Sequence, residues 1–356
     1  MIRVAALTSG RQVPSARFRV RQHILPLRGF GIDIREYAPG IDKYAPIPTS
    51  LQKLNADYRL PYVFVERTWR GVKQATRIPG IIGSWPSRIT WLERQLLPGF
   101  LTLERFLKRP LVFDVDDAIW LHPPAGKYAA DRIARIADVV VAGNRTIAEW
   151  FSVRSKDVRV IPTAVDTERF RPRKEQNVPG KGDFVIGWIG TSFNLKFLES
   201  IEGAIRKFIS DHEEARVHVV SDKPPSLMKS INRRIQYIPW SVAIEAEALQ
   251  QMDVGIMPLP DNEWTRGKCS FKMLQYMACA IPVVVSPVGM NSEILKMGNV
   301  GLPALDEGDW CEAFSYFYKN REVAREVGLN GRRLAESRFS LKVITPMLAD
   351  LFKELA

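Results

Sequence analysis

The feature of this sequence that most constrains its fold is a succession of short, continuously apolar runs rich in β-branched residues. Such runs, with helical patterns between them, are typical of strands in a parallel sheet that is buried on both faces. They form two series, one on either side of a polar segment. The first series covers residues 2–7, 62–66, 111–115, 138–143 and 158–162, and the second covers 184–190, 217–221, 235–239, 253–259 and 282–287.

The polar segment between the two series, RFRPRKEQNVPGKGD at residues 169–183, is rich in proline, glycine and charge and indicates a linker. We therefore expect two doubly wound, Rossmann-like α/β domains, at residues 1–178 and 179–339. A length of 356 residues agrees with two domains of about 150 to 200 residues each. Because ligands of open α/β sheets bind beyond the carboxyl ends of the strands, we expect the functional residues there.

The formal net charge of +12 is unevenly distributed along the chain. Residues 1–178 hold 30 Lys and Arg against 17 Asp and Glu, whereas the remainder is close to neutral. This asymmetry predicts an anionic partner for the N-terminal half, either a phosphorylated substrate, an anionic membrane surface or nucleic acid. No zinc-finger, helix-turn-helix or RNP signature is present, which argues against nucleic acid.

Other bulk features exclude several classes of protein. No stretch approaches the roughly 18 apolar residues of a membrane span, and the opening MIRVAALTSG lacks the order of a signal peptide, so we expect a cytoplasmic protein. The three cysteines, Cys269, Cys279 and Cys311, lack the spacing of a zinc site or a disulfide framework. There is no GxGxxG fingerprint for a nicotinamide cofactor, and we expect no cofactor.

The segment RGKCSFKMLQYMACAIPVVVSP, residues 266–287, places basic and polar residues around the predicted start of a helix. Ser270 is expected to cap that helix, and Lys272 and Gln275 to share a face away from its apolar side. Because a helix N-terminus is already electropositive, Lys268 and Lys272 fit best beside an anion such as a diphosphate. The alternative is that both lysines are ordinary solvated surface residues.

A second phosphate candidate is the turn GWIGTSFNLK that follows the first strand of the second domain. Gly190 permits close backbone approach, Thr191, Ser192 and Asn194 supply hydrogen-bond donors, and Lys196 supplies charge. The same turn is also an ordinary connection between a strand and a helix.

Pro239 and Trp240 stand where a later predicted strand, IQYIP, ends, and a nucleobase could stack there. Trp240 is equally suited to plain packing.

In the first domain, FDVDDAIW places Asp116 and Asp117 at the end of a predicted strand, and His122 follows closely. A carboxylate at this edge can orient an acceptor hydroxyl or accept its proton. The alternative is an ion pair with a basic neighbour or a helix cap. Two carboxylates alone make a loose metal site, so we expect no metal.

The loop TSGRQVPSARFRVRQ after the first strand contains Gly10, which permits a tight turn, and three arginines that suit phosphate through their planar donor fork. Of Arg17, Arg19 and Arg21 at least one is expected on a solvated helix face. Arg17, nearest the loop, is the candidate phosphate ligand.

From VRVIPTAVDTERFRP through GWIGTSFNLKFLESI to FKMLQYMACAIPVVVSPVGMNSEIL, the chain resembles retaining glycosyltransferases of family four, which have the GT-B fold. SARFRVRQHILPLRGFGI and PLVFDVDDAIW look like a bacterial subgroup. The resemblance implies that the second domain binds a nucleotide-activated sugar, that the first binds the acceptor, and that residues 340–356 pack back on the first domain. It also implies a mechanism without metal, in which Lys196 and Lys272 contact the leaving diphosphate.

The sequence departs from the family at one motif. Where the family has two glutamates eight positions apart, this chain has Gly267 and Gln275. Gln275 can still hydrogen-bond ribose hydroxyls, but Gly267 cannot replace a carboxylate. Glu263 lies outside the spacing and would need a loop to bring it near.

Residues 67–109 hold nine Lys and Arg against two acidic residues, interleaved with tryptophan and phenylalanine. This composition suits a membrane interface, where cations meet head groups and rings lie at the acyl boundary. The alternative is an insertion in the acceptor domain that is packed by its own aromatic residues.

Together these features predict a metal-independent glycosyltransferase that moves a sugar from a nucleotide diphosphate to a glycan or lipid-linked acceptor, at the inner face of the cytoplasmic membrane. Two alternatives remain. One is a nucleotide-sugar epimerase of the same fold, and the other is a non-catalytic binder of nucleotide sugars or phospholipids, which the absent glutamates favour.

Overall fold

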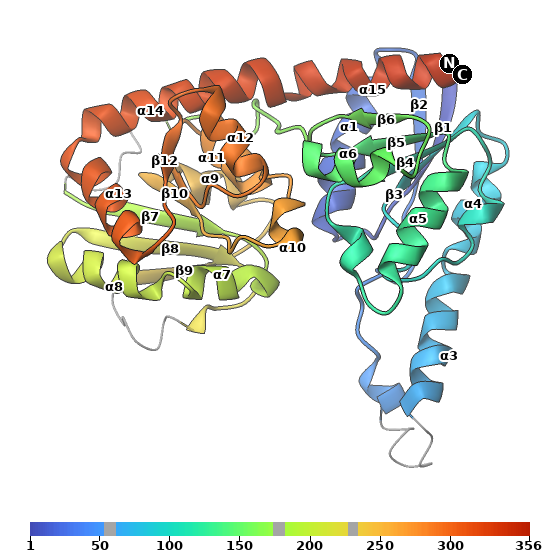
Figure 1. Cartoon of the computed structure of the whole chain (residues 1–356), viewed down its shortest axis with the longest axis horizontal. Helices are drawn as coiled ribbons and strands as arrows, with labels where there is room; N and C mark the ends of the chain where they lie inside the picture. Colours follow the sequence, from blue (N-terminus) through green and yellow to red (C-terminus); the bar gives the residue numbers. More distant parts are fainter. Residues whose placement is uncertain (53–61, 174–181, 227–233) are drawn as a thin grey trace. The chain divides into compact units, whose positions relative to one another are not determined.

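The computed structural model describes residues 1–52, 62–173, 182–226 and 234–356, and the chain forms two compact units (Figure 1). Unit 1 comprises residues 1–164 and 344–356, and unit 2 comprises residues 165–343. The two units thus meet at residue 164, whereas the predicted domains meet at residue 178. Part of the predicted linker, residues 174–181, lies outside the described residues.

Unit 1 is built on a parallel sheet with the strand order β2-β1-β3-β4-β5-β6. Its strands are β1 (Ile2–Leu7), β2 (Ile32–Tyr37), β3 (Ile89–Glu93), β4 (Leu111–Val115), β5 (Val139–Ala142) and β6 (Val158–Val160). Its α-helices are α1 (Gln22–Arg28), α3 (Tyr62–Ala75), α4 (Ile78–Ser84), α5 (Gly126–Ile136) and α6 (Arg145–Ser152).

Unit 2 repeats this arrangement with the order β12-β11-β10-β7-β8-β9. Its strands are β7 (Phe184–Ile189), β8 (Ala215–Ser221), β9 (Ile235–Pro239), β10 (Val254–Met257), β11 (Val283–Val285) and β12 (Gly301–Pro303). Its helices are α7 (Leu195–Glu199), α8 (Glu202–Asp211), α9 (Glu245–Gln250), α10 (Glu263–Arg266), α11 (Phe271–Ala278), α12 (Met290–Met297), α13 (Glu307–Lys319) and α14 (Arg321–Leu334).

The last helix, α15 (Leu341–Leu355), starts at the end of unit 2 and belongs to unit 1 from Ile344 onward. Phe352 packs edge-on against Trp91 of β3, with ring centroids 5.2 Å apart. Thr345 hydrogen-bonds the buried His23 at 2.9 Å. Burial and the charge of Arg19 lower the pKa of His23 to about 3, so this imidazole is neutral. These contacts attach the helix to the first sheet.

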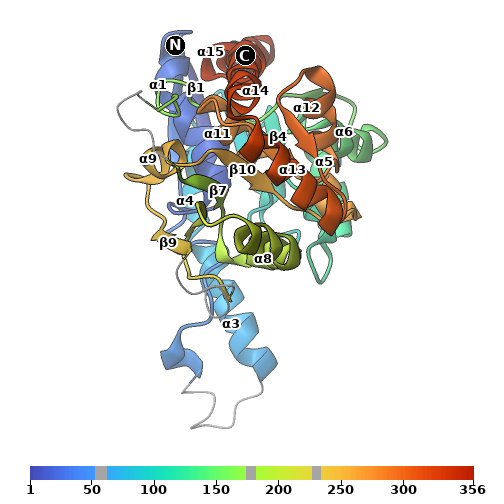
Figure 2. The ribbon, with the colours of Figure 1, turned by 90° about the vertical axis from the view of Figure 1, so that its left-hand side faces the viewer.

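Nine of the ten predicted strands are present, but the prediction at residues 62–66 is wrong, because YVFVE begins helix α3. The run is apolar like a buried strand, yet Val63 and Phe64 are exposed, while Val65 is buried. Figures 1 and 2 both show α3 projecting from the rest of unit 1. No helix in the described ranges is long and apolar enough to cross a bilayer.

In each sheet the strand order reverses once. The reversal lies between β1 and β3 in unit 1 and between β7 and β10 in unit 2. At such a point the loops beyond neighbouring strands leave in opposite directions and open a crevice, which is where ligands of open α/β sheets bind. The residues that follow these four strands are therefore the first place to look for functional groups.

Candidate functional site

At the reversal point of unit 2, Lys272 of α11 lies against Gly190, the residue that follows β7. A Cβ atom on residue 190 would come 2.8 Å from the Nζ atom of Lys272, so the lysine occupies space that only glycine leaves open. The ammonium group also lies 4.5 Å from the ring centroid of Trp188. The structure thus brings together two predicted site residues from different loops.

Lys272 has no ion pair in the part of the chain that the structure describes. Burial lowers its pKa to about 7, and the positive charge of Lys268 acts in the same direction. A partly buried cation without a counter-charge is unfavourable, and its place in the first turn of a helix adds to the positive potential. The site therefore favours an anionic ligand.

The predicted helix cap at Ser270 is wrong in its mechanism. Ser270 does precede α11, but its side chain makes no capping hydrogen bond, because its backbone is left-handed with φ 50° rather than extended. Its side chain is buried. Lys268 is partly buried, and its ammonium group lies 5.3 Å from the ring centroid of Trp264.

The position of α11 is set by Tyr276, which the sequence analysis did not single out. Its hydroxyl accepts from the backbone N–H of Ile189 at 3.0 Å and donates to the carbonyl of Ile256 at 3.2 Å. One side chain therefore ties α11 to both strands of the reversal point. Gln275 is buried beside it and was expected on the ligand-facing side with Lys272.

The turn after β7 is organised by Asp222, at the end of β8. Asp222 accepts from the backbone N–H and the hydroxyl of Ser192, at 2.5 and 2.8 Å. Asn194 donates to the hydroxyl of Thr191 at 3.0 Å. Lys196 is exposed, with its ammonium group 5.0 Å from the ring of Phe193. Several polar groups of this turn bond within unit 2, and Thr191 and Lys196 are the exposed candidates.

At the end of β9, Pro239 is exposed, and Trp240, the next residue, is partly buried. The indole N–H of Trp240 donates to the buried carboxylate of Glu245 at 3.1 Å, and Arg169 pairs with the same carboxylate at 3.0 Å. This network holds the indole ring in a fixed orientation, as both packing and stacking on a base would require.

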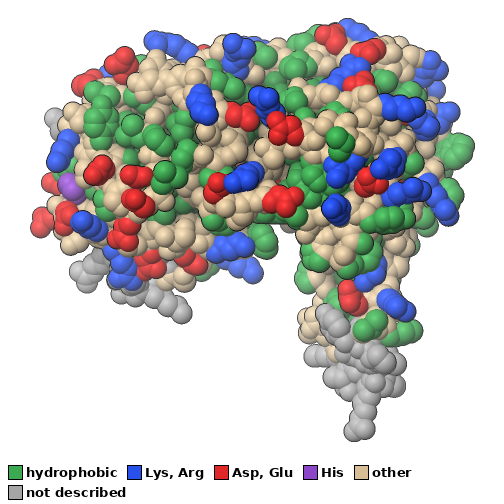
Figure 3. Space-filling model, viewed as in Figure 1, with side chains coloured by type: hydrophobic (Ala, Val, Ile, Leu, Met, Phe, Trp, Pro, Cys, Tyr) green, Lys and Arg blue, Asp and Glu red, His purple; other side chains and the backbone are tan. Residues whose placement is uncertain are grey.

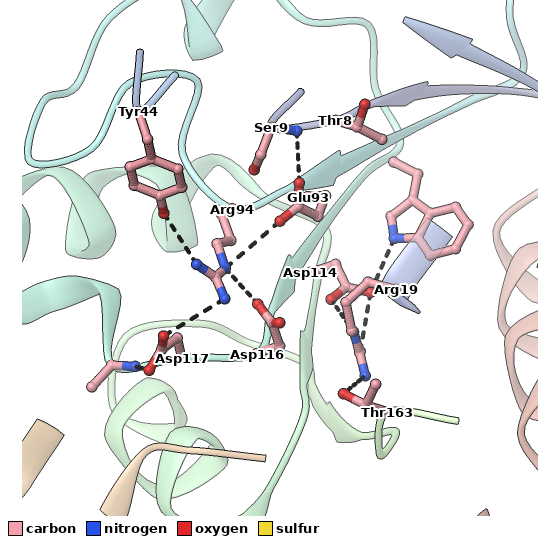
Figure 4. A network of polar contacts seen from close by, with 12 residues as sticks. Thr8, Ser9, Arg19, Tyr44, Glu93, Arg94, Asp114, Asp116, Asp117 and Thr163 are labelled. Atoms are coloured by element: carbon pink, nitrogen blue, oxygen red, sulfur yellow. Dashed lines mark hydrogen bonds and ion pairs between the residues drawn. The ribbon is translucent and has the colours of Figure 1, made fainter. Parts of the chain in front are cut away.

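At the reversal point of unit 1, polar residues surround Arg94, the residue after β3 (Figure 4). Its guanidinium binds Asp116 at 2.5 Å and lies 3.7 Å from Asp117. It also donates to the hydroxyl of Tyr44 at 3.1 Å and lies 3.6 Å from Glu93. Arg94 has φ 57°, a left-handed conformation that is unusual for a residue other than glycine.

These ion pairs fix the charges of the cluster. Burial acts against the charge on Arg94, but Asp116, Tyr44 and Asp117 raise its pKa well above the usual value. Burial likewise acts to raise the pKa of Asp116, and Arg94 more than offsets it, so that the pKa is lowered. The predicted acceptor residues Asp116 and Asp117 are thus carboxylates held by one arginine, which is the ion-pair alternative considered for them.

Two further groups lie near this cluster. Lys43 is only 4% exposed, and its backbone N–H donates to the carbonyl of Ser9 at 3.2 Å. Burial lowers the pKa of Lys43 to about 7, with opposing effects from Glu93 and Arg94. Burial and the charges of Arg94 and Lys43 lower the pKa of the predicted acceptor residue His122 to about 4, so that it is neutral near pH 7.

Gly10 and Arg17, the remaining predicted donor ligands, belong to unit 1. A Cβ atom at residue 10 would overlap the carboxylate of Asp42, which accepts from the backbone N–H of Arg11 at 2.9 Å. Close packing explains this glycine. The guanidinium of Arg17 lies 4.7 Å from the ring of Phe18.

Two of the three arginines, Arg17 and Arg21, are partly exposed. Arg19 is buried and binds both carboxylate oxygens of Asp114, at 2.8 and 3.1 Å. Arg21 pairs with Glu36 at 2.8 Å. Both are used within the fold of unit 1.

Among the described residues, no three His, Cys, Asp or Glu side chains are grouped so that they could hold a metal ion. The sequence analysis missed Lys43, Glu93, Arg94 and Tyr276. The signal for Glu93 and Arg94 was a charged pair directly after the apolar run ITWL, which marks the end of a buried strand. Lys43 lies in a loop and carried no signal.

Comparison with known proteins adds independent information. Residues 183–320 match the model of a family described as Glycosyl transferases group 1. The comparison with curated proteins found no match. Among solved structures, the chain is similar to sucrose-phosphate synthase from Thermosynechococcus elongatus, with a TM-score of 0.72 and 14% identity, over 100% of this chain and 99% of that one.

Two other solved structures are similar over nearly the whole chain. HepE of Anabaena, in complex with UDP-glucose, has a TM-score of 0.71 and 12% identity, with 100% of both chains covered. WaaG, a glycosyltransferase involved in lipopolysaccharide biosynthesis, has a TM-score of 0.65 and 12% identity, over 98% of this chain and 99% of that one. Together they show that the chain has the GT-B fold, which confirms the predicted fold.

Proposed function

We propose that this chain is a glycosyltransferase that moves a sugar from a nucleoside-diphosphate donor, bound at the carboxyl edge of unit 2, to an acceptor bound by unit 1. The GT-B fold supports this proposal, and so does the match of residues 183–320 to the group 1 family model. HepE, which has this fold, was solved with UDP-glucose. As in family four, which the sequence resembles, the transfer proceeds with retention and without a metal ion.

The observation that carries the proposal is Lys272. This lysine is partly buried, has no ion pair among the described residues, and lies against Gly190 at the reversal point of the sheet. A diphosphate bound there supplies the missing counter-charge. When the bond between sugar and phosphate breaks, negative charge builds up on the leaving diphosphate, and the Lys272 ammonium group stabilises it.

The other predicted donor ligands are proposed to contact different parts of the donor. Lys196 and Lys268 contribute positive potential near the diphosphate, and Trp240, held by Glu245, is the platform for the base. Ser270 and Gln275 lie next to Lys272 in sequence and contact the ribose or phosphate region. On the acceptor side, Asp116 and Asp117 are the candidate residues, and Arg94 fixes the orientation of their carboxylates.

The acceptor is proposed to be lipid-linked, and the enzyme to work at the inner face of the cytoplasmic membrane. Helices α3 and α4 and the residue that follows α4 expose large apolar side chains, among them Phe64 at 58%, Ile82 at 65% and Trp85 at 62%. Arg67 is exposed on the same helix as Phe64. Figure 3 shows apolar and basic side chains together over α3. Such a mixture suits binding to an anionic bilayer surface.

The test is a thermal-shift and calorimetric screen of UDP- and GDP-sugars against the full chain, followed by product analysis with a panel of acceptors. We expect one donor to bind, and Lys272→Met to weaken its binding at least about tenfold. The exposed Lys319→Met is the matched control and should bind like the wild type. Binding without hydrolysis or transfer, or conversion of the donor alone to an epimer, contradicts the proposal.

A further inference from the structure

The cluster at the reversal point of unit 1 contains polar groups that the protein itself leaves unused. The hydroxyl of Ser9 and the Oε1 atom of Glu93 are buried, and neither has a hydrogen-bond partner in the described part of the chain. Both side chains are 1% exposed. The Lys43 side chain is 4% exposed, and its ammonium group has no ion pair among the same residues. Folded proteins rarely leave such groups unsatisfied.

These unused groups belong to one place. Glu93 accepts from the backbone N–H of Ser9 through its Oε2 atom at 2.7 Å, and its Oε1 atom, 3.6 Å from the Nε atom of Arg94, has no hydrogen bond among the described residues. The backbone of Lys43 binds the carbonyl of Ser9 at 3.2 Å. In Figure 4, Ser9, Glu93 and Tyr44 lie on one side of the Arg94 guanidinium, and Asp116 and Asp117 lie on the other. Tyr44 is half-exposed, so the cluster borders on solvent.

The charges of this cluster decide which ligand suits it. Lys43, Arg77 and Arg94 face the carboxylates of Glu93, Asp116 and Asp117, and because the pKa of Lys43 is lowered to about 7, these groups carry no net positive charge near neutral pH. A phosphate would meet the carboxylate of Glu93 and would find no surplus positive charge. The unused groups instead comprise an acceptor, a donor and a hydroxyl that can do both. Neutral hydroxyl groups match all three.

We propose that Glu93, Lys43 and Ser9 bind two neighbouring hydroxyl groups of a sugar, with Glu93 accepting from one and Lys43 donating to the other. This inference rests on the proposed glycosyl transfer, because it makes the cluster the binding site for the acceptor and makes the recognised part of the acceptor a neutral sugar. Arg94, Asp116 and Asp117 hold the cluster in place.

The substitution Glu93→Gln distinguishes a sugar ligand from an anionic ligand, because it should change the two binding affinities in opposite directions. The glutamine Oε1 atom keeps the bond to the Ser9 N–H, so its NH₂ group replaces the free oxygen and turns an acceptor into a donor. The substitution also leaves three cations against two carboxylates. Binding of a sugar diol should therefore weaken, whereas binding of an anion should strengthen.

The experiment measures binding to the full-length chain by ligand-observed NMR and calorimetry. The probes are methyl glycosides of common hexoses, their 2-, 3- and 4-deoxy analogues, and inorganic phosphate. We expect at least one glycoside to bind, the deoxy analogue of a recognised hydroxyl to bind at least about tenfold more weakly, and phosphate not to compete. Glu93→Gln and Lys43→Met should each lose about tenfold or more in affinity, and the exposed Lys127→Met should lose none.

Ser9→Ala removes a hydroxyl without an intramolecular bond, so it should fold normally and weaken glycoside binding. Equal binding of glycosides to wild type and Glu93→Gln, or tighter binding of phosphate to Glu93→Gln, overturns the inference. UDP binding is measured on the same samples. If UDP binds and no glycoside does, only this inference fails; if glycosides bind and no nucleotide does, the proposed donor site fails instead.

Discussion

The ammonium group of Lys272 occupies the space beside Gly190 that a β-carbon would fill, at 2.8 Å from where that carbon would lie. Gly190→Ala should therefore displace the lysine, and it should also cost stability, because the same Cβ atom would come 2.7 Å from the ring of the fully buried Trp188. We expect the affinity for the nucleotide-sugar donor found in the screen to fall about tenfold, or ~1.4 kcal/mol, by calorimetry. Gly71→Ala, with open space around its Cβ position, is the control. Unchanged affinity in Gly190→Ala would show that Lys272 does not contact the donor.

Donor binding should depend on pH above neutrality. Free Lys272 has a pKa lowered to about 7 by burial, and a bound diphosphate raises it again, so binding takes up a proton at higher pH. The affinity for a nucleotide-sugar donor, whose diphosphate is a diester without a group titrating near pH 7, should be constant below pH 7 and fall by up to about tenfold per unit above it. Calorimetry from pH 6 to 9 measures this. Lys272→Met should give a flat profile, and a sloping one would point to another group.

Tyr276→Phe should destabilise unit 2. The substitution removes the hydroxyl that bonds Ile189 and Ile256 and leaves two buried backbone groups without a partner, at a cost of about 1–3 kcal/mol. Chemical denaturation of the full chain measures it, with the exposed Tyr316→Phe as control. A loss no larger than in the control would mean that water replaces the hydroxyl.

Removal of Arg94 should be costly because it leaves carboxylates without their counter-charge. We expect Arg94→Met to lower the free energy of unfolding by about 3 kcal/mol and Asp116→Asn in the same chain to restore part of it. The lowered pKa of Asp116 means that its contribution is present above pH 4 and is lost as the pH falls further. Stability curves from pH 2.5 to 7 test both statements, and additive single effects would refute the coupling.

The exposed apolar residues of α3 and α4 should bind anionic membranes. We expect the wild type to sediment with vesicles of phosphatidylglycerol and phosphatidylcholine but not with phosphatidylcholine alone. Phe64→Glu and Ile82→Glu should each weaken binding about tenfold, because each loses apolar burial and adds a negative charge. Met297→Glu, an exposed position in unit 2, should bind like the wild type. Equal binding by all variants would exclude this surface.

The sequence predicted the two sheets because buried parallel strands are continuous apolar runs. It missed β2, β3 and β12 for different reasons. IDIREY alternates as an edge strand does, ITWLE carries a threonine and a glutamate, and β12 has only three residues. The reverse error at YVFVE arose because a short apolar run does not distinguish strand from helix until the basic residues after it are considered.

The candidate site was predicted in outline where helix electrostatics identified it, as at Lys272. The prediction was incomplete where the site depends on contacts between segments that are distant in the sequence. Nothing in the local sequence indicates that Arg94 binds Asp116, or that Tyr276 reaches both β7 and β10. Arg19 and Arg21 look alike in sequence, and only the fold assigns Asp114 to one and Glu36 to the other.

Arg94 and Ser270 share a backbone conformation that glycine adopts more cheaply, by about 1 kcal/mol. Each stands at the reversal point of its own sheet. A laboratory selection for heat resistance alone, with catalysis left unselected, should therefore accumulate glycine at position 270 but retain arginine at position 94, because loss of the Asp116 ion pair costs more than the backbone relief gains. Populations selected for both properties should retain Ser270 as well if the chemistry needs it, so such an evolution experiment would report the functional weight of that strained residue.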